Sequence, residues 1–244
     1  MLQMVDAHIH ALYGVDDGAK TREEMYSIID ASYEQGVRVV CVTPHFYPSL
    51  FGDNAEKTER VFRELREYAE EKYEDLVLCL GNELHYQQGF CEWVESGKCK
   101  TLNGTDYVLL DYRESESLQA IQEGLLRLLN SGYKPILAHV ERYGKLFGRM
   151  KELRRLKRDG VLLQLDAGSV LGDFGLAVKW QSMRLLSGGY ADFISSDAHN
   201  LTSRRTKMLE CCTLIQNKYG VRAAEELFRD RALSILNIQM KEVK

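Results

Sequence analysis

The chain has 244 residues, of which 45% are apolar and 28% are charged, and its formal net charge is -4. This composition is ordinary for a soluble globular protein, and the acidic balance argues against a nucleic-acid partner held by a broad basic surface. No apolar run reaches about 18 residues, so no membrane insertion is expected. The first ten residues show no basic segment followed by an apolar one, which predicts a cytoplasmic protein without a secretion signal.

Short apolar runs alternate with amphipathic segments along the chain. In chain order, the pattern predicts strands over residues 3–7, 37–43, 76–80, 107–112, 135–139, 161–165 and 192–196. Helical spacing predicts helices over residues 55–73, 90–95, 118–129, 150–159 and 176–186, and a helical region from Ser203 onward. One more helix is expected to begin at the capping box Thr21-Arg22-Glu23-Glu24 and to end at Gly36.

These elements make about seven β/α units with short connections. Strands that are apolar nearly throughout are typical of a parallel sheet or barrel whose faces are covered by helices. No connection is rich in proline, glycine or serine, and the chain has only three prolines. The sequence therefore predicts one α/β domain over residues 1–244.

The ends of the predicted strands carry histidines and acids. Five of the six histidines lie at such an end, and carboxylates occupy the ends of further strands. The residues concerned are His8, His10, His45, Glu83, Asp111, His139, Asp197 and His199. In α/β barrels the active site lies at the C-terminal ends of the strands, where these side chains are expected to converge.

Imidazole and carboxylate groups together suit manganese, iron, cobalt or zinc, and the absence of paired cysteines argues against a structural zinc site. Each motif also has a plainer interpretation. An isolated H-x-H is usually solvated, and Asp16-Asp17-Gly18 alone is usually a turn. The coincidence of these motifs at one end of the strands favours a metal site. The candidates are too many for one tetrahedral site, which predicts two or three divalent metal ions.

Several of these motifs occur in an order that resembles a known superfamily. They are D-A-H-I-H from residue 6, T-P-H from 43, G-N-E from 81, A-H-V-E-R from 138 and S-D-A-H-N from 196. The ordered set resembles the PHP (polymerase and histidinol phosphatase) superfamily. Within it, the chain is most similar to the manganese-dependent protein-tyrosine phosphatases of Gram-positive capsule and exopolysaccharide operons. The resemblance implies a distorted (β/α)7 barrel of PHP type with the metal site at the C-terminal ends of the strands.

The resemblance also implies roles for individual residues. The metal ions, manganese first, would be bound by His8, His10, Asp17, His45, Glu83, Asp111, His139, Asp197 and His199. Glu83 would bridge the ions, and Arg142 and Arg204 would contact phosphate, with Arg205 as an alternative to the second. His199 or a third metal ion would stabilise the leaving oxygen.

Three features are peculiar to this chain. Asp111 stands where the superfamily is expected to carry glutamate, and it keeps the carboxylate with a shorter reach. His85 stands where relatives tend to carry an aromatic residue, and we expect it at the rim of the site and not as a ligand. The segment Phe46–Phe51 is either a docking rim for a phosphopeptide or a buried loop.

The implied reaction is the metal-dependent hydrolysis of phosphotyrosine on protein. The implied partner is the C-terminal tail of a bacterial tyrosine autokinase, whose dephosphorylation regulates capsule or exopolysaccharide synthesis. Alternatives are a phosphatase of a small metabolite such as histidinol phosphate, a hydrolase of nucleic-acid ends, and a regulatory protein that binds the kinase tail. Cysteine-dependent tyrosine phosphatases are excluded, because they need a C-x5-R loop and none of the six cysteines has arginine six positions later.

Overall fold

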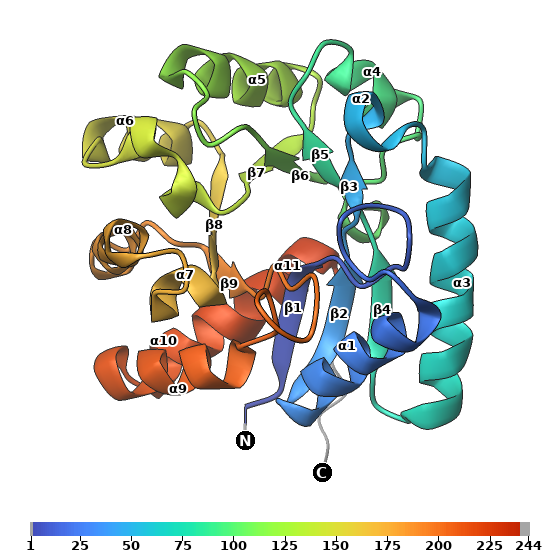
Figure 1. Cartoon of the computed structure of the whole chain (residues 1–244). Coiled ribbons are helices and arrows are strands. Elements are labelled where there is room, and N and C mark those ends of the chain that lie inside the picture. The colour runs from blue at the N-terminus through green and yellow to red at the C-terminus, as the bar shows by residue number, and fades with distance from the viewer. Residues whose placement is uncertain (1, 240–244) are drawn as a thin grey trace.

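The computed structural model describes residues 2–239, so residue 1 and residues 240–244 of the expected domain lie outside the described residues. Its strands form a curled parallel sheet with helices around the outside (Figure 1). The strands are β1 (Met4–Ile9), β2 (Val37–Val42), β3 (His45–Phe46), β4 (Val77–Leu80), β5 (Glu83–His85), β6 (Tyr107–Asp111), β7 (Lys134–Leu137), β8 (Leu162–Asp166) and β9 (Phe193–Ser195). Their orders are β1-β2-β4 and β3-β5-β6-β7-β8-β9.

Two strands are interrupted near the functional end of the sheet. β3 follows β2 after Thr43-Pro44, and β5 follows β4 after Gly81-Asn82. The Glu83 amide and the Asn82 side chain both donate to the carbonyl oxygen of Pro44, at 3.1 and 3.0 Å. With each interrupted pair counted as one strand, the described residues form a seven-stranded sheet, and the predicted distorted (β/α)7 barrel is confirmed.

The first and last strands meet at their C-terminal ends. Ile9 forms a parallel bridge with Ala198. The amide of His10 donates to the carbonyl oxygen of Ala198 at 2.9 Å, and the amide of Asp197 donates to that of His8 at 2.9 Å. These bonds place the H-x-H motif directly beside the S-D-A-H-N motif, although the two lie near opposite ends of the chain.

Helices lie around the outside of the sheet. They are α1 (Arg22–Glu34), α2 (Pro48–Phe51), α3 (Ala55–Lys72), α4 (Phe90–Glu95), α5 (Leu118–Asn130), α6 (Met150–Arg158), α7 (Ala167–Leu171), α8 (Leu176–Ser187), α9 (Met208–Tyr219), α10 (Val221–Glu225) and α11 (Arg231–Leu236). The predicted N-cap is present, because the Thr21 hydroxyl accepts from the amide of Glu24 at 3.2 Å, whereas the Glu24 side chain accepts from the amide of Lys20 and not from that of Thr21. Among the described residues, no helix is both long and apolar enough to cross a membrane.

The segment after Ser203 differs from the prediction. It remains a loop until α9 begins at Met208. The cause is Asn200, whose side-chain oxygen accepts from the amides of Thr202 and Arg204 at 2.9 and 3.0 Å. Such a side-chain turn competes with a helix for the backbone donors. The pattern also does not predict the short elements β3, β5, α2 and α7, which are too brief to show a periodicity.

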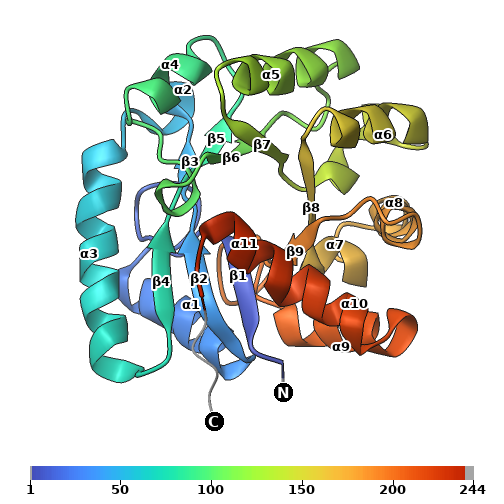
Figure 2. The same cartoon turned by 180° about the vertical axis from the view of Figure 1, so that it is seen from behind.

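Two apolar clusters lie on the two sides of the sheet. The larger one packs helical residues such as Met25, Leu65 and Leu125 against the outer face of the strands. The smaller one joins alternate strand residues, such as Val5 and Val39, to the apolar residues of α11. In Figure 2, α11 lies in front of β1 and β2, on the side away from the viewer of Figure 1. It therefore closes the barrel interior at the end opposite to the C-terminal ends of the strands.

Candidate metal centre

The predicted ligands converge at the C-terminal ends of the strands. Three sets of ligand atoms each lie within 4.8 Å of one another, namely His10, Asp17, His45 and His199, then His8, His10 and Asp197, and then His45, Glu83 and Asp111. The ninth predicted ligand, His139, has its Nε2 atom 2.9 Å from Glu83 Oε1. The structure thus brings all nine side chains into one centre.

Glu83 lies in the middle of this centre, and its side chain is only 1% exposed. Its Oε2 atom lies 3.4 Å from His8 Nε2, 3.2 Å from His10 Nε2 and 2.9 Å from His45 Nδ1. Its other oxygen faces His139. A carboxylate surrounded by four imidazole rings is in the position that suits a ligand shared between metal ions.

Several buried atoms of the centre make no hydrogen bond to the described residues. They include Glu83 Oε2, Asp197 Oδ1, His45 Nδ1 and His199 Nε2. Buried polar atoms in proteins are otherwise almost always hydrogen-bonded. The Nε2 atoms of His8 and His10 also face each other at 3.2 Å, where a shared cation would satisfy both lone pairs. This donor set of nitrogen and carboxylate oxygen fits divalent metal ions.

Two of the candidate ligands sit in strained backbone conformations. His139 has φ 32° and Asp197 has φ 50°, both in the left-handed region. Non-glycine residues in this region are uncommon and cluster at functional sites, where surrounding contacts hold them. His139 is held by its amide, which donates to Gln164 Oε1 at 2.7 Å, and Asp197 by its bond to His8. The two turns direct both side chains into the centre.

Gln164 and Asp16 support the histidines, although the sequence pattern does not single them out. Gln164 Oε1 lies 3.2 Å from His8 Nδ1, and Asp16 Oδ2 lies 2.7 Å from His10 Nδ1. The same Asp16 oxygen accepts from the amide of His45 at 2.8 Å. Such partners fix the orientation of ligand histidines. The available signals were a glutamine inside the apolar strand β8 and the pairing of Asp16 with Asp17.

Burial controls the charges around the centre. It raises the pKa of Asp6 to about 6, although the amide of Ser196 donates to this carboxyl at 3.0 Å. Burial, followed by the neighbouring His10, lowers the pKa of His199 to about 4, so its ring is neutral at pH 7. Asp17 is the most exposed of the candidate ligands, with a side chain 47% exposed and its Oδ1 atom 3.4 Å from His199 Nε2.

Two guanidinium groups meet at one oxygen of Asp197. Arg142 Nη2 donates to Asp197 Oδ2 at 2.9 Å and Arg204 Nη2 donates to it at 2.7 Å. The Nε atoms of both arginines are buried without a hydrogen-bond partner among the described residues. Arg205 is exposed, and no contact joins it to the centre in the described part of the chain. Two guanidinium groups with unsatisfied Nε donors beside a candidate metal ligand suit an anionic group such as phosphate.

His85 lies inside the protein and not at the rim. It is 6% exposed, its Nδ1 atom lies 2.6 Å from Asp111 Oδ2, and its ring stacks on Tyr47 with centroids 3.9 Å apart. The reason is strand geometry, since Glu83 and His85 are two residues apart in β5 and face the same side. The short carboxylate of Asp111 thus gains a partner that orients it.

The segment Phe46–Phe51 combines the two predicted alternatives. Phe46 is 1% exposed and packs on Trp93, so it belongs to the core. Leu50 is 64% exposed, and Phe51 stacks on the candidate ligand His45 with centroids 5.8 Å apart. Any docking role of this segment therefore falls on the residues after Phe46, among which Leu50 is the most exposed apolar side chain.

The fold and the ligand chemistry of this centre are those of a metal-dependent hydrolase. A family model described as capsular polysaccharide synthesis, CpsB/CapC, matches residues 4–237. The chain belongs to this CpsB/CapC family. The tyrosine-protein phosphatase CpsB of Streptococcus pneumoniae is 35% identical over 97% of this chain and the whole of that protein. CpsB of Streptococcus agalactiae serotype III is 31% identical over 96% of this chain and 98% of that protein.

Solved structures share the fold. The crystal structures of YwqE from Bacillus subtilis and CpsB from Streptococcus pneumoniae, described as unique metal-dependent tyrosine phosphatases, give a match with TM-score 0.87 and 24% identity that covers 98% of this chain and 96% of the other. Histidinol phosphate phosphatase from Lactococcus lactis, complexed with zinc, L-histidinol and phosphate, matches with TM-score 0.57 and 15% identity over 90% of this chain and 95% of the other. At these identities, the likeness is one of fold.

Proposed function

We propose that this chain is a metal-dependent protein-tyrosine phosphatase that regulates capsule or exopolysaccharide synthesis. Its family includes relatives named tyrosine-protein phosphatases that match it over nearly its whole length. One observation carries the proposal. Buried oxygen atoms of Glu83 and Asp197 make no hydrogen bond to the described residues, and Arg142 and Arg204 both donate to the other oxygen of Asp197 in the same centre. A phosphomonoester hydrolase needs both parts, a metal site that activates water and cationic groups that bind phosphate.

The nine converging side chains are proposed to hold two or three divalent ions, with manganese as the native metal. When bound, such ions would supply Lewis-acid activation of water and of the phosphoryl group. Iron, cobalt and zinc share this ligand preference, so metal analysis of the protein purified from its own cells would test the choice of manganese.

Arg142 and Arg204 are proposed to bind the phosphate. Their unpartnered Nε groups can donate charge-assisted hydrogen bonds to its oxygens while Asp197 holds both guanidinium groups in place. The partial burial of the centre strengthens these interactions. His199 is proposed to bind a metal ion, and this ion or His199 itself would stabilise the leaving oxygen. The leaving phenolate has a pKa of about 10 and departs without strong acid assistance.

The proposed substrate is a phosphotyrosine protein, in the first place the C-terminal tail of a bacterial tyrosine autokinase, and the proposed location is the cytoplasm. We also propose that residues 1–244 form one domain. Support for one domain comes from the larger apolar cluster. It contains residues of β1, near the start of the described chain, and Phe228, near its end.

Phosphate release from a phosphotyrosine peptide tests the proposed activity. We expect turnover with added manganese, loss of turnover with excess chelator, and recovery when manganese is returned. His139→Ala removes the ring that contacts Glu83 and is expected to lower kcat by about a hundredfold or more. Two or more bound metal ions per chain without turnover of the peptide would overturn the phosphotyrosine assignment, and histidinol phosphate would be the next substrate in the same assay.

Thiol alkylation provides a second prediction. All six cysteines are buried, and burial raises the pKa of Cys79 to about 12. Buried, protonated thiols react slowly and have no place in the proposed reaction. Iodoacetamide should therefore leave the activity of the folded, metal-loaded protein within about twofold of the untreated protein. Inactivation by alkylation, with the circular dichroism spectrum unchanged, would contradict the metal-dependent mechanism.

A further inference from the structure

One part of the surface carries far more positive charge than the rest of the chain. We call it the cationic surface, and its residues are Lys145, Arg149, Lys151, Arg154, Arg155 and Arg158. All six side chains are exposed, on α6 and on the loop before it. Residues 143–158 contain seven basic residues and one acidic residue, whereas the whole chain has a net charge of -4. Positive charge is therefore concentrated in this segment although the chain as a whole is negatively charged.

Most of these charges have no ionic partner. Among the described residues, Arg155 alone of the six has a carboxylate within 4.0 Å, Asp159 at 3.7 Å. Helix α3 shows the contrasting, mixed pattern of a solvated helix, with six acidic and five basic residues interspersed. Helix α6 has five basic residues and one acidic residue. Like charges three or four positions apart on a helix repel one another, so solvation alone does not account for this composition.

The helix dipole explains only part of the pattern. Arg155 and Arg158 lie in the last turn of α6, where cations are favourable. Lys145, Arg149 and Lys151 precede or open the helix, where the positive end of the dipole disfavours them. Arg149 is the N-cap residue, and its side chain makes no capping hydrogen bond. These three charges weaken the local fold, which points to an anionic partner that binds them.

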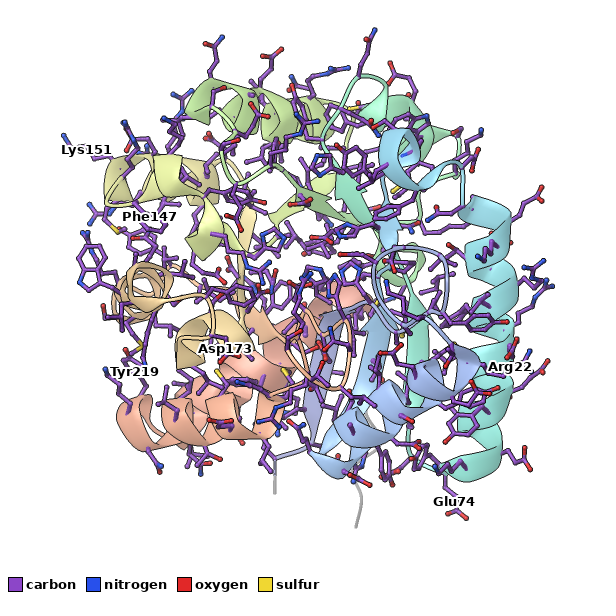
Figure 3. The ribbon with its side chains drawn as sticks, viewed as in Figure 1. Arg22, Glu74, Phe147, Lys151, Asp173 and Tyr219 are labelled. Carbon is purple, nitrogen blue, oxygen red and sulfur yellow. The ribbon has the colours of Figure 1, made fainter. Side chains whose placement is uncertain are left out.

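The cationic surface begins beside the metal centre. Arg142 ends the short helix η2 (Val140–Arg142), and Lys145 follows within η3 (Gly144–Leu146). Helix α6 then runs from the end of the barrel that carries the metal centre back to the start of β8, which follows it by three residues. Figure 3 shows Lys151 pointing from α6 away from the molecule. A peptide that leaves the phosphate-binding arginines in this direction passes directly onto the cationic surface.

The outer part of the cationic surface is hollowed. A surface cavity of about 640 Å³ is lined by Lys151, Arg154, Lys157, Arg158 and Tyr190, among others. Lys157 is neutralised there by Asp192, with Nζ and Oδ2 2.7 Å apart, and Arg154 Nε donates to the Tyr190 hydroxyl at 2.6 Å. Lys151 and Arg158 have no carboxylate partner among the described residues, so the cavity offers uncompensated positive charge to a ligand.

We infer that the cationic surface binds an acidic segment of the phosphoprotein substrate, rich in aspartate and glutamate and adjoining the phosphotyrosine. This inference rests on the proposed function and names the class of substrate. Arginine pairs with carboxylates in bidentate geometry, and four of the six residues are arginines. Charges at the edge of a binding site act mainly on encounter, so the acidic segment should lower KM and leave kcat nearly unchanged.

Two phosphotyrosine peptides of equal length test the inference on the manganese-loaded protein. One carries aspartate and glutamate beside the phosphotyrosine, and the other carries asparagine and glutamine at the same positions. We expect kcat/KM to be about tenfold higher for the acidic peptide at low ionic strength, with a smaller ratio as salt is added. Arg149→Glu with Lys151→Glu should bring the ratio to about one. The new acids favour the helix N-terminus, so the variant should keep the wild-type Tm.

Helix α3 offers a matched control. Arg60→Glu with Arg63→Glu changes the net charge by the same amount at exposed positions and should keep the wild-type ratio. Equal kcat/KM for the two peptides in the wild-type protein would overturn the inference. A preference for the acidic peptide that falls as much in the α3 variant as in the α6 variant would also overturn it. Binding to phosphatidylglycerol vesicles that is lost in the α6 variant, without any peptide preference, would also overturn it and assign the surface to a membrane.

A binding measurement separates this inference from the proposed function. Fluorescence anisotropy of the labelled acidic peptide needs no turnover. Peptide binding that is lost in the α6 variant and kept in the α3 variant would support the docking surface even if no phosphate is released. In that case the proposed phosphatase activity alone would be wrong. Turnover of both peptides with equal affinity would leave the phosphatase activity intact and remove the docking surface.

Discussion

Replacing Glu83 with glutamine is expected to lower kcat/KM on a phosphotyrosine peptide by about a thousandfold, which corresponds to about 4 kcal/mol. The two oxygens of this buried carboxylate face four imidazole rings. An amide nitrogen cannot replace an oxygen ligand, and the negative charge that balances the metal ions is lost. Metal analysis of the purified Glu83→Gln protein should therefore show fewer ions per chain than the wild type.

The same variant separates metal binding from folding. Ions that bind only the native state stabilise it by about 4 kcal/mol at a thousandfold excess over Kd, so a chelator should lower the wild-type Tm. Without metal, Glu83→Gln should be less stable than the wild type, because the surrounding imidazole groups hold the pKa of this buried carboxyl well below its usual range and a neutral amide loses that stabilisation. Glu59→Gln, at an exposed position on α3, is the matched control. Wild-type metal content and activity in Glu83→Gln would contradict the bridging role.

Arg142→Met is expected to lower the free energy of unfolding by about 3 kcal/mol or more. It should also lower kcat/KM by about a hundredfold or more. The Arg142 side chain is 9% exposed, and its Nη2 atom lies 2.5 Å from Asp166 Oδ2 and 2.9 Å from Asp197 Oδ2. Methionine fills much of the volume but leaves Asp166 as a buried carboxylate without its cation. Urea unfolding and steady-state kinetics measure the two effects.

A second substitution separates the structural effect from the functional one. Asp166→Asn added to Arg142→Met removes the unpaired carboxylate, so the stability should rise toward that of the wild type while the activity stays low. Arg184→Met, which removes a guanidinium group that stacks on Trp180, is a control outside the metal centre. Recovery of both stability and activity in the double variant would limit Arg142 to a structural role and leave phosphate binding to Arg204.

The local sequence pattern predicts most of the helices and strands, because apolar residues recur in them at regular spacing. Helices α3, α5, α6 and α8 end within one residue of their predicted limits, since each carries an apolar stripe and glycine follows closely after α5, α6 and α8. The positions of the candidate ligands follow from the same alternation of strands and helices, because the C-terminal ends of the strands in a parallel barrel lie on one side. Asp17 is different. It lies in a turn, and only the resemblance to the superfamily indicated that it would reach the centre.

Contacts between distant strands could not be predicted in the same way. The breaks that form β3 and β5 depend on Asn82 and Glu83 meeting the carbonyl of Pro44, about forty positions away in sequence. Gln164 looks like an interruption of an apolar strand until the fold places it beside His8 and His139. His85 was expected at the rim because its sequence neighbourhood carries no information about Asp111. In each case, the deciding partner comes from another strand.

Closure of the barrel by α11 has a consequence for the order of folding during synthesis. The candidate ligands extend from His8 to His199, whereas the inner apolar cluster is completed by Ala232, Ile235 and Leu236. A chain that emerges from the ribosome at about 5–20 residues per second presents its last ligand a few seconds before α11. The nascent protein therefore has all its candidate ligands in place while the interior of the barrel is still open to water. Helix α11, which closes this interior, is the last helix to be synthesised.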